Sequence, residues 1–169
     1  DKQISYDGEI SGTELIGKKV TTPHKNQSIP MLEASFVEPE TGTGLVMSVP
    51  AHAPFDYQAL ADLKKSKPQD SELQSIQPIS IIETAGYGEN PAKQAVEKLG
   101  FSNQDDPKLE QATEEVYGKE FYGGVLKQNT EQFAGKKVSE AKDIIKECLA
   151  EKKYSAILPE LTYTPVRCR

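Results

Sequence analysis

The chain has 169 residues, of which 36% are hydrophobic and 27% charged, and this composition suits a folded domain better than a disordered segment. Its formal net charge of −6 argues against a domain that holds nucleic acid tightly by itself, because such affinity comes largely from Lys and Arg. No apolar run approaches the roughly 20 residues that cross a bilayer, and the first residues lack the apolar stretch of a signal peptide. We therefore expect a cytoplasmic protein without a membrane span.

The first part of the chain is predicted to form β-hairpins. Between residues 4 and 37, short alternating stretches are broken by turn-forming pairs of Asp, Ser and Gly. After a turn-prone segment comes an apolar run from Leu45 to Val49, bounded by Gly44 and Pro50. A short apolar run with such boundaries predicts a buried strand.

The residues after Pro54 change to a helical period, which continues as far as the polar residues 64–70. A tight turn from Pro50 to Pro54 should therefore lead from the predicted strand into a helix. A further strand is expected over residues 76–82, followed by a turn at residues 86–88.

Three more helices have clear signals. Asn90 with Pro91 suits the start of a short helix, and Asp106 with Pro107 suits the start of a longer one that runs to about residue 117. Residues 138–149 place apolar side chains on one face and Glu and Lys on the other, which predicts a helix packed on the core. Short strands are expected after Gly123-Gly124 and within residues 156–166.

Together these elements predict a mixed fold, α+β or α/β, in a single domain over residues 1–169. No internal repeat, low-complexity segment or linker divides the chain. The two cysteines, Cys148 and Cys168, are too few for a disulfide framework and lack the spacing of a zinc knuckle. We expect both to be reduced thiols.

Residues 42–57 are the most informative for chemistry. They place His52 and Asp56 on the turn and first helical turn that follow a predicted strand, where side chains emerge at the end of a sheet. The helix macrodipole favours an ionised carboxylate at Asp56. A charged carboxylate on a rigid turn is a good receptor for an ammonium group, such as the α-amino group of an amino acid. We expect His52 and Asp56 to line a common cleft.

Each of these residues also has a simpler interpretation. Asp56 could only stabilise the first turn of a helix, and His52 could be a structural turn residue bonded to the backbone. The glycines at 42 and 44 could only shape a turn, which is favoured over a phosphate cradle because the spacing of neither nucleotide motif is present. A Ser48–His52 nucleophile pair is disfavoured, because Ser48 lies within a strand pattern. With only two histidines and no H-E-x-x-H spacing, zinc hydrolysis is also disfavoured.

The same segment resembles a family signature. The residues that carry it are, in order, Gly42, Thr43, Gly44, Met47, Ser48, Val49, Pro50, Ala51, His52 and Asp56. This string is similar to that of the editing domains inserted in leucyl-, isoleucyl- and valyl-tRNA synthetases, and the form with Met47 and Ala53-Pro54-Phe55-Asp56 is most similar to the leucyl enzymes of archaea. Weaker similarity extends over most of the chain. The resemblance implies a fragment of the connective peptide 1 editing domain, with a β-barrel-like core and peripheral helices.

The resemblance also implies roles for individual residues. Asp56 would hold the α-amino group of the amino acid on a mischarged tRNA(Leu) while water attacks the ester bond. Met47 and Val49 would line the amino-acid pocket and exclude leucine by their bulk, and His52 would lie near the terminal adenosine or the ester. The implied substrate-binding residues are Gly42, Thr43, Gly44, Met47, Ser48, Val49 and His52. No metal or cofactor is implied for this domain, since ATP and Mg serve a separate active site of the parent synthetase.

The chain departs from the family pattern in three places. Ala53 stands where bacterial leucyl enzymes carry a second Asp, so that role is not carried over. A threonine-rich segment that forms the other wall of these sites is not found in the sequence, and we expect it upstream. Arg167-Cys168-Arg169 resembles the beginning of a longer cysteine-containing stretch, so Cys168 could belong to a site completed elsewhere. We therefore expect the isolated chain to fold but not to edit.

Two other functions stay open at this point. The chain could be a valyl or isoleucyl editing fragment, although those families usually differ around residues 47–50. It could also be a non-catalytic module that contacts a tRNA acceptor end or a protein through acidic helices between residues 105 and 120. In the leading interpretation, the partners are the 3′ end of tRNA(Leu) and the rest of the synthetase.

Overall fold

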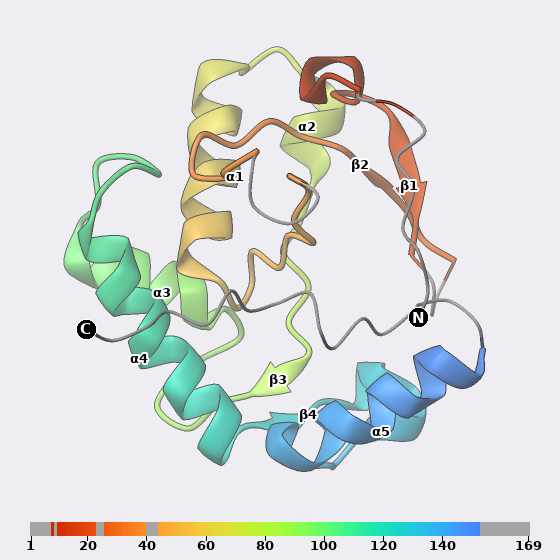
Figure 1. Ribbon diagram of the computed structural model, residues 1–169. Coiled ribbons are helices and arrows are strands. Elements are labelled where there is room, and N and C mark those ends of the chain that lie inside the picture. The colour runs from red at the N-terminus through yellow and green to blue at the C-terminus, as the bar shows by residue number, and fades with distance from the viewer. Residues whose placement is uncertain (1–7, 9, 23–25, 40–43, 153–169) are drawn as a thin grey trace, which may run out of the picture.

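Helices dominate the computed structural model, which describes residues 8, 10–22, 26–39 and 44–152 (Figure 1). The α-helices are α1 (Pro54–Ser66), α2 (Ser71–Ser75), α3 (Pro91–Leu99), α4 (Lys108–Gly123) and α5 (Val138–Glu151). Two short 3-10 helices, η1 (Gly12–Glu14) and η2 (Gln128–Phe133), complete the helical elements of these residues. The strands are β1 (Lys19–Thr21), β2 (Ser28–Pro30), β3 (Ile82–Glu83) and β4 (Val125–Leu126).

The described strands form two separate two-stranded antiparallel sheets. β1 pairs with β2 so that Val20 lies opposite Ile29, and β3 pairs with β4 so that Ile82 lies opposite Leu126. The predicted mixed α and β architecture is therefore confirmed. The barrel-like core implied by the resemblance stays a prediction.

Three helices make one packed unit. α1, α3 and α4 contact one another pairwise, and in Figure 1 they occupy one side of the molecule while α5 and the β1–β2 hairpin lie on the other. The interface of α3 with α4 buries Ala95, Ala112 and Val116, and Tyr87 and Phe101 pack against them. Because these side chains come from α3, from α4 and from the segments beside them, they fix how α3 and α4 meet.

Two further clusters complete the core of the described residues. α1 and α2 bury Leu60, Leu63 and Leu73 against each other. The predicted helix at residues 138–149 is confirmed as α5, and its Ala141 packs with Leu126 and Phe133. The expected closing strands at residues 156–166 lie outside the described residues.

The predicted helix starts are confirmed, although α4 begins at Lys108, one residue later than expected. The Asn90 side chain accepts a hydrogen bond from the Lys93 N–H at 3.0 Å and caps α3. Asp106 accepts from the Lys108 N–H at 3.0 Å at the start of α4, which continues to residue 123 and not to about residue 117. In the added turn Glu120 is buried, whereas Phe121 and Tyr122 are exposed.

Two strand predictions are wrong. Residues 45–49 form no strand, and the side chains of Leu45, Val46, Met47 and Val49 are 40–59% exposed, so this run is not a buried strand. The strand expected over residues 76–82 is limited to β3, because residues 71–75 form α2 and the chain then runs without strand pairing to Ile82. Both strands were predicted from apolar runs alone, and in the described fold these runs have no neighbouring strand to pair with over most of their length.

Candidate functional site

The segment before α1 makes a closed turn. The carbonyl oxygen of Val49 accepts hydrogen bonds from the N–H groups of His52 and Ala53, each at 2.9 Å. Pro54 then begins α1, in keeping with its fixed φ and missing N–H. The Ala51 carbonyl accepts from the Ala92 N–H at 3.0 Å, so the turn is also attached to the first turn of α3.

Asp56 reaches back across this turn. Its Oδ2 accepts a hydrogen bond from the Val49 N–H at 2.6 Å, and the side chain is only 6% exposed. Burial raises the pKa of the Asp56 carboxyl above its ordinary value of 3.8, and hydrogen bonds from the Val49 N–H and the Ser48 side chain oppose that shift. The predicted position in the first helical turn is confirmed, and the carboxylate lies among donors from the turn.

His52 is held on both sides of its ring. Its Nε2 accepts from the Ile81 N–H at 2.9 Å, and its Nδ1 lies 2.6 Å from Oε1 of Glu120. A backbone N–H can only donate, so Nε2 carries no proton and the neutral ring donates Nδ1–H to Glu120. His52 is only 4% exposed, and its contacts fit the alternative in which it is a structural turn residue. Its expected place near the terminal adenosine or the ester stays a prediction.

His52 and Asp56 come from the same turn, as expected, but both are buried. The expectation that the two side chains line a common cleft is therefore wrong for the described residues. Their enclosure has a physical cause, since α3, α4 and the segment before β3 all contact the turn. The turn is rigidly placed, and the surface beside it is formed by residues 45–49.

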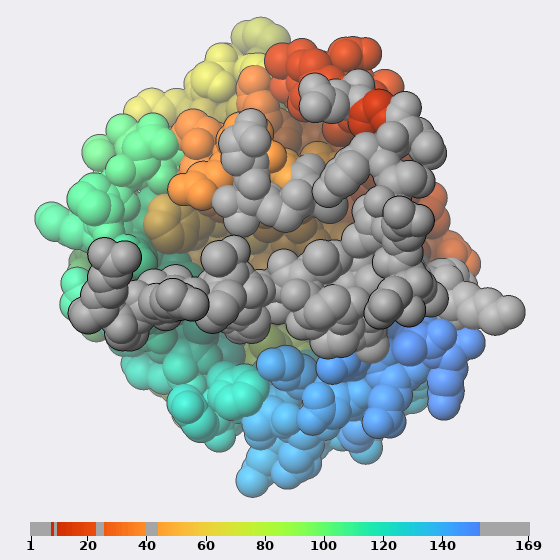
Figure 2. Space-filling model, in the orientation of Figure 1, coloured from red at the N-terminus to blue at the C-terminus, as the bar shows by residue number. Residues whose placement is uncertain are grey.

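The expected pocket residues Met47 and Val49 are 57% and 40% exposed. Figure 1 shows this segment crossing the middle of the molecule before it enters α1, and Figure 2 shows atoms of the orange-to-ochre part of the chain at the surface of the same face. Gly44 begins the segment with φ of +67°, and a Cβ there would lie 2.9 Å from the Pro39 carbonyl oxygen. Gly44 is therefore required by the backbone. Gly42 and Thr43 lie outside the described residues.

Sequence reasoning missed two residues that contact the site. Glu120 is 4% exposed and accepts from His52, and the Thr84 hydroxyl lies 3.4 Å from the same Oε1. One signal was present for Glu120, because it continues the buried stripe of Leu109, Ala112 and Val116 at helical spacing. A carboxylate on the apolar face of a helix predicts a buried polar partner.

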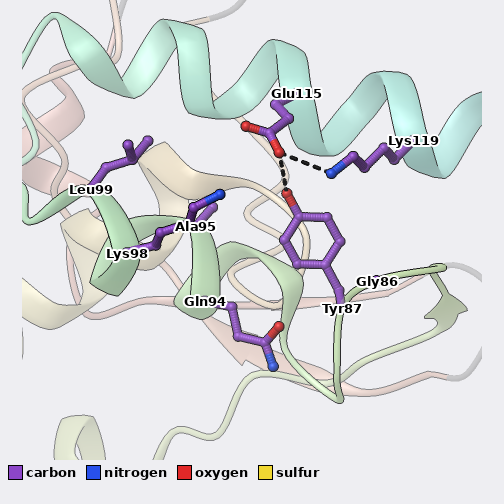
Figure 3. Close-up of a pocket in the computed structure, with 8 residues that line it drawn as sticks. All are labelled: Gly86, Tyr87, Gln94, Ala95, Lys98, Leu99, Glu115 and Lys119. Carbon is purple, nitrogen blue, oxygen red and sulfur yellow. Dashed lines mark hydrogen bonds and ion pairs between the residues drawn. The ribbon is translucent and has the colours of Figure 1, made fainter.

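Among the described residues, two cavities lie away from this turn. One, of about 140 Å³, lies between α3 and α4 (Figure 3). Beside it, the Tyr87 hydroxyl donates to Glu115 at 3.2 Å. The Lys119 ammonium lies 2.9 Å from Glu115 and 4.8 Å from the centre of the Tyr87 ring. Burial raises the pKa of Tyr87, and the bond from Lys119 lowers that of Glu115. The other, about 460 Å³, is lined by Ala34, Asp62 and Gln104 among others.

Neither a metal cluster nor a membrane-crossing helix occurs in the described ranges. No group of three or more His, Cys, Asp or Glu side chains is placed there to hold an ion, and no helix there is long and apolar enough to span a bilayer. Cys148 is a half-buried free thiol, and Cys168 lies outside these ranges.

Known proteins match this chain over its whole length. The family described as "Leucyl-tRNA synthetase, editing domain" matches residues 2–76. A leucine–tRNA ligase of Methanothrix thermoacetophila is 46% identical over 173 residues, which cover 100% of this chain and 18% of the ligase. The chain belongs to the leucyl-tRNA synthetase editing-domain family. A leucine–tRNA ligase of Pyrobaculum calidifontis is 37% identical over 99% of this chain and 20% of its own length.

Solved structures agree with this assignment. The crystal structure of GlLeuRS-CP1 superposes on the editing-domain chain with a TM-score of 0.80 and 29% identity, over 93% of this chain and 63% of that one. The P. falciparum cytosolic leucyl-tRNA synthetase editing domain, at 24% identity and a TM-score of 0.76, has the same fold over 84% of this chain and 47% of its own. The chain thus spans about a fifth of the curated synthetases and less than two thirds of these editing-domain structures.

Proposed function

We propose that this editing-domain chain supplies one wall of a site that hydrolyses the ester bond of mischarged aminoacyl-tRNA(Leu) in a cytoplasmic leucyl-tRNA synthetase. The observation that carries the proposal is the fixed position of Asp56 at the start of α1, beside the exposed apolar residues of the preceding segment. A carboxylate next to an apolar surface suits an amino acid, which presents an ammonium group and a side chain together.

In the proposed reaction, Asp56 accepts hydrogen bonds from the ammonium group of the bound amino acid. Met47 and Val49 contact its side chain, and a positioned water attacks the carbonyl carbon of the ester. The tetrahedral oxyanion would be stabilised by backbone N–H groups, for which residues 42–44 are our candidate. The leaving ribose oxygen takes up the proton that the attacking water loses, and the products are the free amino acid and the tRNA.

The parent synthetase would supply most of the affinity for tRNA. The chain carries a net charge of −6, so it offers phosphates little attraction by itself. We propose that the threonine-rich wall and the β-barrel-like core belong to the complete domain, in which β1 would pair further because it is exposed along its length. In this proposal the isolated chain folds without editing, and the editing site needs no cofactor.

The test is Asp56→Ala in the intact synthetase. Deacylation of mischarged tRNA(Leu) should fall by about a hundredfold or more, because the ammonium group loses its receptor and the ester is no longer positioned. Leucylation of tRNA by the same enzyme should be unchanged. Asp143→Ala, which removes an exposed carboxylate from α5, is the matched control. Deacylation that survives Asp56→Ala would remove this residue from the site and with it the proposal.

The two alternatives give different outcomes. A valyl or isoleucyl editing fragment would act on tRNA(Val) or tRNA(Ile), so the same assay with those substrates separates it from the leucyl function. A non-catalytic module would leave deacylation unchanged in every variant of the turn. The leucine–tRNA ligases that match the full chain favour the leucyl assignment.

A further inference from the structure

We propose that Glu120 is a positioning residue for the editing site, because it holds His52 and thereby the turn that places Asp56. The inference rests on the proposed function for its catalytic consequence, although the positioning itself is a property of the fold. Glu120 belongs to α4 and lies 68 positions after His52 in the sequence. Its side chain contacts His52 and Thr84, and of these only His52 belongs to the turn that places Asp56.

The first step of the argument is the contact between Glu120 and His52. The carboxyl oxygen of Glu120 is 2.6 Å from Nδ1 of His52, and both side chains are almost completely buried. A buried, short hydrogen bond between a ring N–H and a carboxyl oxygen is strong and directional. It also selects the ring tautomer in which Nε2 is free to accept the Ile81 N–H.

The second step leads from His52 to Asp56. The His52 backbone N–H donates to the Val49 carbonyl, while the Val49 N–H donates to the Asp56 carboxylate. These two bonds meet at Val49, so a displaced His52 would move the donor that orients Asp56. The His52 ring is bonded on one side to α4 and on the other to the segment before β3. Glu120 therefore orients the turn from outside it.

The third step distinguishes the effect of the length of the Glu120 side chain from the effect of its charge. Glu120→Gln keeps an oxygen that can accept Nδ1–H, whereas Glu120→Asp keeps the charge but shortens the side chain by roughly 1.5 Å and ends the contact. If Glu120 acts by holding His52, Gln should preserve function and Asp should not. If Glu120 acts only through its negative charge near Asp56, the order should be reversed.

The experiment measures deacylation of mischarged tRNA(Leu) by the intact synthetase carrying Glu120→Asp, Glu120→Gln or Glu120→Leu. We expect kcat/KM to fall between about tenfold and a hundredfold for Asp and Leu, as for a misplaced catalytic group, and to stay within about threefold of wild type for Gln. Glu114→Asp, at an exposed position of α4, is the matched control. Leucylation of tRNA by each preparation shows that the enzyme is folded.

Amide hydrogen exchange of the same enzymes gives a readout that does not depend on activity. Glu120→Asp should speed exchange in a peptide covering residues 45–53, whose amides include the donors to Val49 and Asp56, and should leave α5 unchanged. The positioning role would be overturned if Glu120→Asp left exchange in this peptide unchanged. It would also be overturned if Glu120→Gln lost deacylation while Glu120→Asp retained it. If Asp56→Ala leaves deacylation intact, the proposed function fails, and exchange alone still decides whether Glu120 holds the turn.

Discussion

Asp56 is subject to two opposing influences. Loss of water around the carboxyl raises its pKa, while the Val49 N–H and the Ser48 side chain lower it, and burial is the largest of the three. The first-turn position on α1 alone would have favoured the ionised form, so the net direction is the reverse of what a helix terminus predicts. A buried carboxylate is stabilised when a cation binds to it, which suits a residue proposed to bind an ammonium group.

This pKa makes a prediction for stability against pH. The folded chain binds a proton to Asp56 more readily than the unfolded chain does, so the contribution of Asp56 to the free energy of unfolding is greatest below its ordinary pKa of 3.8 and declines as pH rises through the raised folded value. Asp56→Asn removes this titration while keeping an oxygen that can accept the Val49 N–H. The difference in unfolding free energy, wild type minus Asn, should therefore decrease from pH 3.5 to pH 7 in urea titrations. A difference that grows over this range would contradict the assigned direction.

Gly44 gives a second prediction at this scale. Its φ of +67° and the nearby Pro39 carbonyl leave no room for a side chain, so Gly44→Ala should destabilise the chain by about 1–3 kcal/mol. Gly118→Ala is the matched control, because Gly118 lies inside α4 with open space around it and alanine there should stabilise by roughly 0.5–1 kcal/mol. The two substitutions should change the free energy of unfolding, measured by chemical denaturation, in opposite directions. Equal effects of the two substitutions would show that the backbone at Gly44 does not require glycine.

At the scale of elements, helix starts and stops could be predicted because their signals are local. Asn90 caps α3 with its own side chain, Asp106 accepts from the Lys108 N–H at the start of α4, and the apolar stripe of α5 needs no knowledge of its partners. Residues 45–49 were wrongly predicted because an apolar run looks the same whether it is covered by its own chain or left exposed. The Glu120–His52 contact could not be foreseen, since the two residues meet only when α4 packs beside α1.

The exposed segment makes a prediction about specificity, which rests on the proposed function. Met47 and Val49 are the residues proposed to contact the amino-acid side chain, whereas Val46, exposed in the same segment, has no such proposed contact. Met47→Ala or Val49→Ala should allow the intact synthetase to hydrolyse correctly charged Leu-tRNA at least about tenfold faster than wild type, because a few methylene groups decide such exclusion. Val46→Ala should not. If only Val46→Ala releases leucine, the segment has the opposite orientation.

The whole molecule combines a helical support with an exposed segment. α1, α3 and α4 pack into one unit, and the turn at residues 49–53 is bonded to each neighbouring element through His52 or Ala51. The negative net charge gives this chain little attraction for the phosphates of a nucleic acid, in keeping with the proposal that the remainder of the synthetase binds the tRNA body.

The most direct test of the central claim is a crystal structure of the intact synthetase with a non-hydrolysable analogue of a mischarged terminal adenosine. We predict that the ammonium nitrogen of the analogue lies about 3 Å from a carboxylate oxygen of Asp56, with the amino-acid side chain against Met47 and Val49. An ammonium group bound elsewhere, with Asp56 still enclosed by Val49 and out of contact with the ligand, would contradict the account.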